Sequence, residues 1–371
     1  MKRILATAAA IALGFGLTAA RADDVTIAVA GPFTGDNAAF GVQLKLGADA
    51  AMKDINAAGG VNGKMVKIEY GDDACDPKQA VAVANAMSAK KVAAVIGHFC
   101  SGSSIPASKV YEEEGIVQIS AASTNPDFTE KGGWNVHRVC GRDDQQGAVA
   151  GAFLAKKYAG KIVALLDDKS TYGKGLADQT AMAMNKAGLK EVMHESVNAD
   201  EKDYTALVSK LKDAKIDALY FGGYYKAAGL IQRQMREQGL QAQLIMGDAL
   251  ATLDFWGIAG DAGEGMIFTF PPDPQNRPEN KAIVDAMKAS GGNPEGYTLY
   301  AYAAIQAWAQ AAKGVGGFDS HKIATWLRAG NPLDTVLGKI AMNAKGDIGD
   351  ASYAYAWYKF SKGKYAQTDS P

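Results

Sequence analysis

The chain has 371 residues, with 39 lysines and arginines against 40 aspartates and glutamates, which leaves a formal net charge of −1. Hydrophobic residues make up 48% of the sequence, charged residues 21%, and there are only 3 cysteines. This balance excludes a disordered chain and a disulfide-dense mini-protein, and no basic excess is present to attract nucleic acid or an anionic membrane. The length is typical of two or three domain-sized units.

The first residues have the pattern of an export signal. Lys2 and Arg3 precede an apolar stretch (residues 4–19), and Ala20-Arg21-Ala22 places small residues where a signal peptidase cleaves. A transmembrane anchor is the alternative, but the stretch is alanine-rich and short for a bilayer core of about 30 Å. We therefore expect residues 1–22 to be removed before Asp23 and the protein to be exported to an oxidising compartment.

The cysteines fit such a compartment. Cys75 and Cys100 are 25 positions apart, and a bridge closing that loop would stabilise the fold by about 3.5 kcal/mol in the chain-entropy model. Three free thiols are the alternative. Cys140 follows a strand-like segment, and we expect it to be a buried small apolar residue.

Short β-branched runs alternate with helical runs through most of the chain. In the first part we predict strand 25–30, helix 41–58, strand 65–70, helix 77–90, strand 92–96, helix 104–114 and strand 116–120. The alternation then restarts with helix 146–158, strand 161–166, helix 175–187, strand 192–196, helix 204–214, strand 217–221, helix 227–238, strand 243–246 and strand 265–270. This pattern predicts two doubly wound α/β units, each with a mostly parallel sheet covered by helices.

The tail differs after a proline-rich break at residues 271–274. Helices are predicted at 279–289, 298–312 and 321–328, followed by antiparallel strands within 338–364. Three helices and a hairpin cannot form a third doubly wound domain. We expect the tail to complete the first two units, so that the chain crosses between them more than once.

Ligands of open α/β sheets bind beyond the carboxyl ends of the strands. In the first unit the segments there, residues 97–104 and 121–126, are rich in small and hydroxyl side chains. Hydroxyls and backbone N–H groups at a helix start bind a carboxylate or a phosphate, although the same residue types also serve as simple N-caps.

The corresponding segments of the second unit, 167–173, 222–225 and 247–249, offer aromatic side chains and one carboxylate, Asp248. Asp248 is either a ligand-binding acid or a helix cap. A hydroxyl-rich side that faces an aromatic and acidic side suits a small zwitterion with an apolar part.

Enzyme signatures are absent from the mature sequence, which has no G-x-G-x-x-G, P-loop, G-x-S-x-G or H-E-x-x-H motif. The four histidines are scattered, and we interpret them as structural or surface residues: His98, His137, His194 and His321. We therefore predict neither enzyme activity nor a cofactor or metal.

Seven stretches, in order over the mature chain, resemble the periplasmic leucine/isoleucine/valine-binding proteins of ABC importers. They are GDDACDPKQAVAVAN (71–85), VIGHFCSGSSIPAS (95–108), EEEGIVQISAAST (112–124), GRDDQQG (141–147), YGKGLAD (172–178), EKDYTALVSKLK (201–212) and FGGY (221–224). The resemblance implies the type I periplasmic binding protein fold, in which two Rossmann-like lobes joined by three hinge crossings close on a ligand like a Venus flytrap.

The resemblance also implies an organisation and a role. It would place residues 23–142 and 272–348 in lobe 1, and residues 143–271 and 349–371 in lobe 2. The protein would be a monomer in the periplasm. It would capture a neutral, branched-chain aliphatic L-amino acid and deliver it to the membrane subunits of an ABC permease.

The resemblance further assigns the site. It implies a disulfide between Cys75 and Cys100. It places the ligand carboxylate on Ser101 and Thr124. It places the ligand ammonium on the backbone carbonyl of Ala122, the hydroxyl of Thr124 and the carboxylate of Asp248. The implied side-chain pocket consists of Phe40, Phe99, Tyr172, Tyr224, Tyr297 and Tyr300.

Two positions depart from part of this family. Some members have Glu where Asp248 stands and Tyr or Trp where Phe40 stands, which changes the reach of the acid and the depth of the pocket. A broader amino-acid set, including alanine or threonine, is therefore an alternative. A further alternative is the same fold with a non-amino-acid ligand, such as an amide, urea or an aromatic acid.

Overall fold

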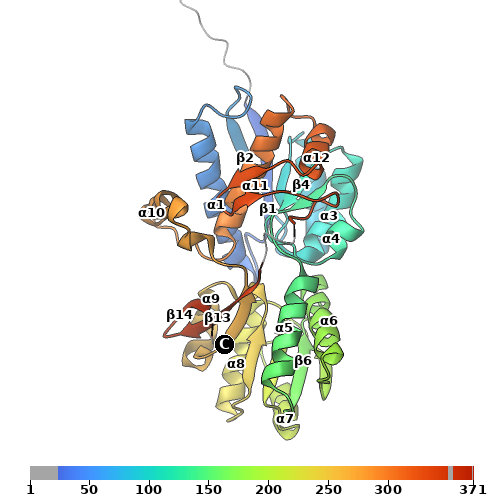
Figure 1. The fold of residues 1–371 in the computed structure, drawn as a ribbon, viewed down its shortest axis with the longest axis vertical. Helices are drawn as coiled ribbons and strands as arrows, with labels where there is room; N and C mark the ends of the chain where they lie inside the picture. Colours follow the sequence, from blue (N-terminus) through green and yellow to red (C-terminus); the bar gives the residue numbers. More distant parts are fainter. Residues whose placement is uncertain (1–23, 350–353, 370) are drawn as a thin grey trace, which may run out of the picture.

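The structure, a computed structural model, describes residues 24–349, 354–369 and 371. The predicted leader lies outside the described residues, as do residues 350–353 of the predicted C-terminal strands. The described chain forms two lobes stacked along the long axis of the molecule (Figure 1). No described helix combines the length and the apolar character that a bilayer span needs.

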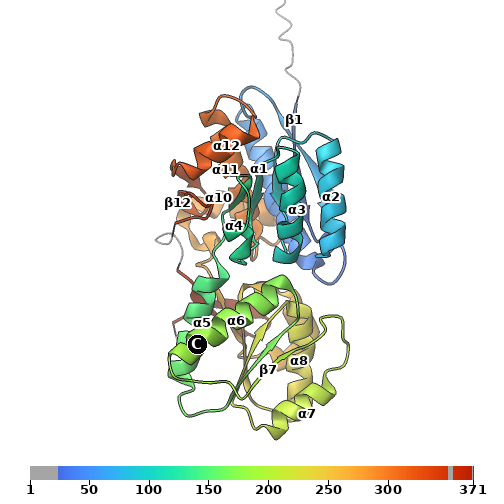
Figure 2. The same ribbon diagram turned by 90° about the vertical axis from the view of Figure 1, so that its right-hand side faces the viewer.

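The first lobe is built around a five-stranded sheet. Its elements before the chain first leaves it are β1 (Val25–Gly31), α1 (Ala38–Ala57), β2 (Val66–Asp72), α2 (Pro77–Ala89), β3 (Val95–Gly97), α3 (Ser101–Glu113), β4 (Gln118–Ser120), α4 (Asp127–Glu130) and β5 (Val136–Arg138). The strand order is β2-β1-β3-β4-β5 and all pairs are parallel. Figure 2 shows α2 and α3 on one face of this sheet and α1 on the other, which keeps the sheet buried on both sides.

The second lobe follows the same plan. Its elements are α5 (Asp143–Lys157), β6 (Val163–Asp167), α6 (Thr171–Lys186), β7 (Met193–Ser196), α7 (Thr205–Asp213), β8 (Ala218–Gly222), α8 (Tyr225–Glu237), β9 (Gln243–Met246), the 3₁₀ helix η1 (Asp248–Leu250), α9 (Asp254–Ala259), η2 (Gly260–Gly263) and β10 (Ile267–Phe270). Strands β10-β9-β8-β6-β7 are neighbours in this order and run parallel. The two lobes thus repeat one doubly wound arrangement.

The chain passes between the two sheets three times. It leaves the first lobe after β5, returns after β10, and leaves again after β12. The tail elements in the first lobe are η3 (Pro274–Asn276), η4 (Pro278–Asn280), α10 (Lys281–Ala289), α11 (Thr298–Gly314), α12 (Ser320–Arg328), β11 (Leu333–Thr335) and β12 (Gly338–Ile340). This confirms the predicted fold class, with two doubly wound lobes and three crossings.

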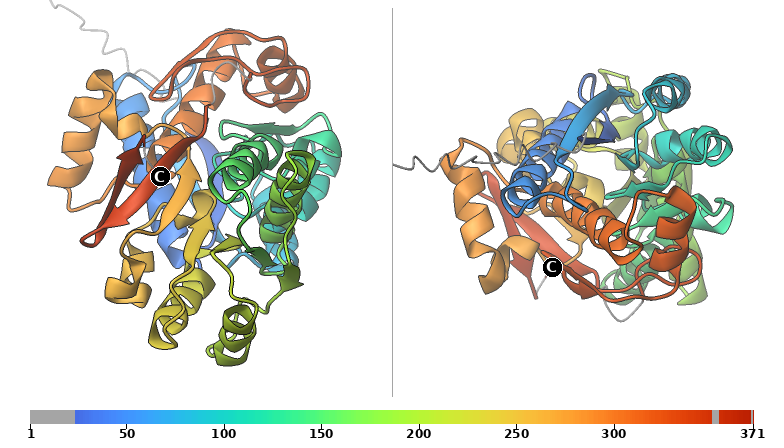
Figure 3. Two further views of the ribbon diagram at one scale, coloured as in Figure 1. Left: turned by 60° about the horizontal axis from the view of Figure 1, so that its bottom comes forward. Right: turned by 90° about the horizontal axis from the view of Figure 1, so that it is seen from above.

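The C-terminal hairpin completes the second sheet rather than the first. Strands β13 (Ala356–Ser361) and β14 (Lys364–Thr368) pair antiparallel with each other, and β13 pairs antiparallel with β10. Figure 3 shows these red strands at the edge of the second sheet. The antiparallel strands predicted within 338–364 are present as β12, β13 and the start of β14, but β12 pairs with the unpredicted β11 in a separate small hairpin.

Three helices, each with its N-terminus near the contact between the lobes, begin earlier than predicted. Helix α3 begins at Ser101 rather than at residue 104, α5 at Asp143 rather than 146, and α6 at Thr171 rather than 175. The first turn of each is polar, so the hydrophobic periodicity starts only in the second turn. Hydroxyl and acidic residues are favoured at helix N-termini, where unpaired N–H groups lie. The displaced starts bring Ser101, Asp143 and Tyr172 into the first helical turns.

Close packing of α11 on α1 shows why the tail belongs to the first lobe. A Cβ atom on Gly47 of α1 would lie 1.9 Å from the carbonyl oxygen of Thr298 at the start of α11, so only glycine permits this approach. Trp308 on α11 is fully buried. The contact holds the segment after β10 firmly against the first sheet.

Candidate functional site: two unlike sides of the interlobe contact

Two loops at neighbouring strand ends form the lobe 1 side of the site. Ser101 begins α3 after β3, whereas Ala122 and Thr124 follow β4. The hydroxyl oxygen of Ser101 accepts a hydrogen bond from the backbone N–H of Asn125 at 3.2 Å, which ties the two loops together. Ser101, Ala122 and Thr124 are all buried. The two segments that the sequence places beyond strand ends therefore lie beside each other in the structure.

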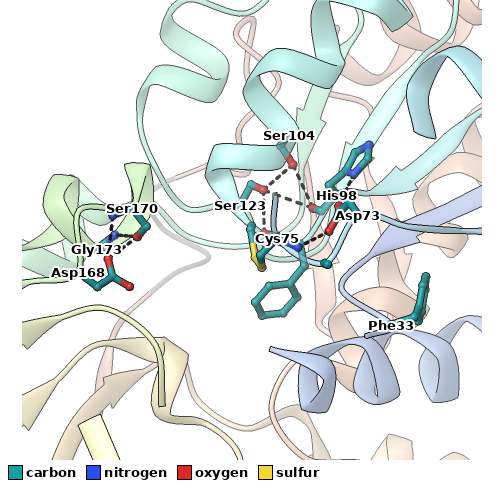
Figure 4. The surroundings of a disulfide bond; sticks show 12 residues. Phe33, Asp73, Cys75, His98, Ser104, Ser123, Asp168, Ser170 and Gly173 are labelled. Carbon is teal, nitrogen blue, oxygen red and sulfur yellow. Dashed lines mark hydrogen bonds and ion pairs between the residues drawn. A yellow bond between two sulfur atoms is a disulfide. The ribbon is translucent and has the colours of Figure 1, made fainter. Parts of the chain in front are cut away.

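The serines of these loops maintain the loop conformation. The carbonyl oxygen of His98 accepts hydrogen bonds from the hydroxyls of Ser104 (3.1 Å), Ser120 (2.8 Å) and Ser123 (3.3 Å). The Ser120 hydroxyl oxygen in turn accepts from the backbone N–H groups of Ala122 and Ser123 at 3.2 and 2.9 Å. Figure 4 shows the part of this network that converges on His98. Because Cys100 is the N-cap residue of α3 and makes no side-chain cap, simple capping does not account for the hydroxyls.

The disulfide between Cys75 and Cys100 is present and borders the same loop. Its Cα atoms are 5.5 Å apart, and it joins the segment after β2 to the residue before α3. Beside it, the His98 ring contacts the buried carboxylate of Asp73 through Nδ1 and the hydroxyl of Tyr111 through Nε2, at 3.0 Å for the latter. The loops of Asp168, Ser170 and Gly173 that Figure 4 also draws belong to the second lobe.

Arg138, at the end of β5, connects these loops to the crossings between the lobes. Its guanidinium donates to the carbonyl oxygens of Ser123 at 2.6 Å and Asn125 at 3.1 Å. The same buried side chain pairs with Asp347 at 2.7 Å, and Arg142 pairs with the second oxygen of Asp347 at 2.9 Å. Arg142 directly precedes α5, and Asp347 lies shortly before the third crossing. These ion pairs therefore join the loop after β4 to the first and the third crossing between the lobes.

Asp248 marks the other side of the site. One carboxyl oxygen accepts a hydrogen bond from the hydroxyl of Tyr172 at 2.9 Å, and the other accepts from the hydroxyl of Tyr297. Burial raises the pKa of Asp248, while the two tyrosine hydroxyls lower it. Gly247 is the N-cap residue of η1, so the Asp248 side chain faces the tyrosines instead of capping the helix.

Five of the predicted pocket residues form a continuous chain of rings across the two lobes. Phe40 stacks on Phe99, with ring centroids 4.3 Å apart, and Phe99 meets the edge of Tyr297 at 5.2 Å. Phe40 also lies 6.3 Å from Tyr224, which lies 5.2 Å from Tyr172. None of these side chains is more than 9% exposed. The rings are therefore almost fully shielded from solvent.

The sixth predicted pocket residue, Tyr300, lies behind this chain of rings. Its ring packs against Tyr297 at 5.4 Å and Phe270 at 5.9 Å. Tyr225, which sequence reasoning did not select, contacts the edge of Phe40 at 5.5 Å. Its position next to Tyr224 was the only available signal.

Two further residues of the site were missed. Gln43 on α1 donates to the carbonyl oxygen of Ala251 at 3.0 Å and accepts from the backbone N–H of Tyr297 at 2.8 Å. Asp143, at the start of α5, lies near both Asp248 and Thr124. Adjacent acids such as Asp143 and Asp144 are common at helix starts, so the sequence alone did not single out Asp143. Gln43 gave no signal at all.

The lobes are in direct contact around these residues. Lys226 at the start of α8 pairs with Asp36 of the first lobe, and the Asn125 amide donates to the backbone carbonyl of Thr171 at 2.8 Å. Together with the bond from Gln43 to Ala251, these contacts surround the buried rings and carboxylates. The described arrangement is therefore a closed one.

The described residues contain no group of three or more His, Cys, Asp or Glu side chains able to hold a metal ion. The candidate site consists of hydroxyls and amides on one side, carboxylates on the other, and aromatic rings between them. This arrangement suits a small ligand that carries opposite charges a short distance apart.

The sequence profile of the periplasmic binding protein family matches residues 24–364. The chain belongs to this family. A Leu/Ile/Val-binding protein homologue of Brucella suis is 47% identical over 97% of this chain and 96% of that protein. An amino acid binding protein of Pseudomonas aeruginosa is 48% identical over 99% of this chain and 98% of that protein.

Among solved structures, the branched-chain amino acid transporter substrate-binding protein LivJ of Streptococcus pneumoniae, in complex with isoleucine, superposes with a TM-score of 0.83. It is 26% identical, and the match covers 93% of this chain and 98% of LivJ. The family and this structural neighbour are solute-binding proteins. The resemblance predicted from the sequence is thus confirmed at the level of the family.

Proposed function

We propose that the protein captures a branched-chain aliphatic L-amino acid between its lobes and delivers it to the permease of an ABC importer. The observation that carries this proposal is the juxtaposition of Ser101 and Thr124 on one side with Asp248 on the other, around buried aromatic rings. The names of the Brucella relative and of LivJ, and the isoleucine bound to LivJ, point to the same ligand class.

The ligand carboxylate would bind Ser101 and Thr124. Both lie at or near the N-terminus of α3, a helix of 13 residues whose unpaired N–H groups and dipole favour a negative charge. The ammonium would bind the carbonyl oxygen of Ala122, the hydroxyl of Thr124 and the carboxylate of Asp248. The Thr124 hydroxyl supports this assignment, since it is buried without a hydrogen-bond partner among the described residues.

The aliphatic side chain would lie among Phe40, Phe99, Tyr172, Tyr224 and Tyr297, with Tyr300 behind them. Each methylene group buried there contributes about 0.8 kcal/mol, so the rings would grade ligands by size. The charged head group would set most of the affinity, because charge-assisted hydrogen bonds contribute about 1.5–3 kcal/mol each.

Closure follows from a ligand that touches both lobes. A ligand that binds the closed arrangement more tightly than the open one shifts the population toward it. We infer that residues 23–142 with 272–348 move as one lobe, and residues 143–271 with 349–371 as the other. The membership of the strands in two separate sheets supports these boundaries.

The proposed setting is the periplasm, reached through a cleaved leader of 22 residues, where the protein would act as a monomer. The family assignment supports this location. The closed form would be the state that the permease membrane subunits recognise. No catalytic step and no cofactor enter this scheme.

A broader amino-acid range is a second candidate. The Pseudomonas relative carries the general name of an amino acid binding protein, and two tyrosines with hydroxyl groups, Tyr172 and Tyr224, lie among the pocket rings. Such hydroxyls accommodate small polar side chains such as that of threonine.

The test is the melting temperature of the mature protein against L-Leu, L-Ile, L-Val, L-Ala, L-Thr, L-Phe and L-Glu. The proposal expects the largest stabilisation from the three branched-chain amino acids, because a ligand stabilises the state that it binds. Comparable shifts with Ala and Thr would favour the broader range. Stabilisation by an amide, urea or an aromatic acid, without any response to amino acids, would refute the proposal.

A further inference from the structure

Helices α3 and α6, one from each lobe, approach each other at their N-terminal turns (Figure 2). Gly102 is the second residue of α3, and Thr171 is the first residue of α6. A Cβ atom built on Gly102 would lie 3.4 Å from Oγ1 and 3.7 Å from Cβ of Thr171, so little more than a methyl group would fit between the two helix ends. Neither residue belongs to the proposed ligand contacts.

Asn125 of lobe 1 reaches across this approach. Its side-chain amide donates to the backbone carbonyl oxygen of Thr171 at 2.8 Å, and the residue is 7% exposed. The other polar groups of Asn125 are bonded within lobe 1. Its backbone N–H donates to the Ser101 hydroxyl at 3.2 Å, and its carbonyl oxygen accepts from Arg138 at 3.1 Å. Its Oδ1 accepts from the backbone N–H of Asp127 at 2.9 Å. Lobe 1 therefore presents a donor whose direction is already fixed.

Gly175 of lobe 2 leaves the space that this amide occupies. It lies four residues after Thr171 and thus on the same face of α6. A Cβ atom on Gly175 would lie 2.5 Å from Nδ2 and 3.7 Å from Cγ of Asn125, and the first of these distances is too short for a real contact. The helical backbone does not require glycine there, because Gly175 is absent from the residues with positive φ. Glycine weakens a helix interior, so its position calls for a packing reason, and the Asn125 amide supplies one.

We propose that Asn125 and Gly175 form an interlobe latch, which sets how readily the lobes close without itself contacting the ligand. The amide bond to Thr171 exists only while the lobes are together, and it forms only because Gly175 has no side chain. The latch therefore stabilises the closed arrangement alone, and both the affinity for a ligand and its residence time depend on it. The inference rests on the proposed function for its ligand readout, whereas closure itself is measurable without a ligand.

The first experiment measures L-leucine binding to Gly175→Ala by calorimetry. The variant is expected to bind about fivefold more weakly or worse, because the added methyl group displaces the amide when the lobes close. Its melting temperature without ligand is expected to equal or exceed that of wild type, since alanine is the better helix former and the overlap is absent from open lobes. Gly257→Ala is the matched control, because Gly257 is a helical glycine of the same lobe whose Cβ atom would meet nothing within 4 Å.

A double-mutant cycle with Asn125→Ala tests whether the two residues act together. Asn125→Ala alone is expected to lower the affinity for leucine about twofold to tenfold, as one hydrogen bond between the lobes is lost. In this background Gly175→Ala is expected to change the affinity by less than about twofold, because the amide that it would displace is gone. An equal loss from Gly175→Ala in both backgrounds, or a loss accompanied by a lower ligand-free melting temperature, would refute the latch.

A cross-link between the lobes measures closure without a ligand. Gly102→Cys combined with Thr171→Cys places two Cβ atoms about 3.7 Å apart in the closed arrangement, which suits a disulfide. The latch uses the carbonyl oxygen of Thr171 and is kept, and the free Cys140 is buried. Adding Gly175→Ala is expected to slow formation of this bridge about fivefold, but not when Asn125→Ala is also present. Mass spectrometry after blocking of free thiols follows the reaction, and equal rates with and without Gly175→Ala would overturn the proposal.

The outcomes distinguish this inference from the function on which it rests. If wild type does not bind leucine but Gly175→Ala slows the cross-link, the proposed function fails and the latch stands. If wild type binds leucine and Gly175→Ala changes neither the affinity nor the cross-linking rate, only the latch is refuted.

Discussion

The two sides of the site solve the problem of binding opposite charges in different ways. On the lobe 1 side, the serines and Arg138 satisfy the backbone oxygens of His98, Ser123 and Asn125 before any ligand is present. On the opposite side, Asp143 and Asp248 bring two buried acids together, and burial raises the pKa of both. The lobe 1 side is thus largely bonded within the protein, apart from the Thr124 hydroxyl, whereas the opposite side concentrates buried acids.

This difference distinguishes residues that mainly stabilise the fold from residues that mainly bind a ligand. A loop whose backbone oxygens are bonded contributes to folding and presents its dipoles in fixed directions. A pair of buried acids opposes folding until a cation neutralises it. We therefore expect substitutions on the lobe 1 side to lower stability mainly, and substitutions of the acids to lower affinity mainly.

The largest effect is expected for Arg138→Met. The substitution removes one ionic partner of the buried Asp347. It also removes the donor to the carbonyl oxygens of Ser123 and Asn125. Breaking one partner of a buried ion pair costs about 3–5 kcal/mol, so urea unfolding is expected to show a loss of that size. Arg233→Met, in which an exposed arginine is replaced, is the control and should change little. An unchanged unfolding free energy for Arg138→Met would contradict the expectation that the lobe 1 side of the site contributes mainly to stability.

Removal of the disulfide is expected to come next. Cys75→Ser combined with Cys100→Ser opens a loop of 25 residues, for which the chain-entropy model gives a loss of about 3.5 kcal/mol. Thermal unfolding of the double variant measures this loss. A stability equal to that of wild type would mean that the bridge adds nothing to the loop network.

Asp248→Asn is expected to affect binding more than folding. It keeps the shape and the tyrosine contacts but removes the charge, which corresponds to about 1.5–3 kcal/mol and a loss of about tenfold to a hundredfold in affinity for leucine. Calorimetry tests the affinity, with the exposed Asp254→Asn as control. Unchanged affinity would remove Asp248 from the site.

The smallest effect concerns Glu295, a half-buried acid outside the proposed ligand contacts. Its carboxylate accepts from the Thr252 hydroxyl and the Leu253 backbone N–H at 3.1 Å each, and burial raises its pKa to about 7. The folded state thus binds the proton more tightly than the unfolded chain, whose pKa is near 4.5. Stability contributed by the proton is full below the lower value and is lost as the pH rises through the upper one.

Urea unfolding of wild type and Glu295→Gln at about pH 5 and pH 8 measures this term. Wild type is expected to lose stability relative to the variant at the higher pH, by about 1 kcal/mol or less. Glu279→Gln, on an exposed side chain, should show no such difference. A relative gain by wild type at high pH would contradict the sign. Glu295 accepts two hydrogen bonds within the protein and lies outside the proposed ligand contacts. This measurement therefore reports the effect of burial on stability without a contribution from ligand binding.

Much of the fold was predictable because hydrophobic periodicity is local. Strand β9 begins and ends as predicted, and the restart of the alternation after residue 145 revealed the second lobe. The polar first turns of α3 and α6 were missed, since periodicity begins only where a helix meets the core. The pairing of β11 with β12 was missed because these strands are three residues long.

The site was predictable only in part. The structure brings together the rings and polar residues that the family resemblance indicated, although their roles stay predictions. Gln43 was missed because its partner Ala251 lies 208 positions away, and no local pattern records such a contact. The isolation of Asp143 was invisible because a missing partner shows only once every neighbour is in place.

The most direct test of the whole account is a crystal structure of the mature protein grown with L-leucine. The account predicts leucine between the closed lobes, with its carboxylate at Ser101 and Thr124 and its ammonium at Ala122, Thr124 and Asp248. An empty interlobe site, or leucine bound with its two charged ends exchanged, would contradict it.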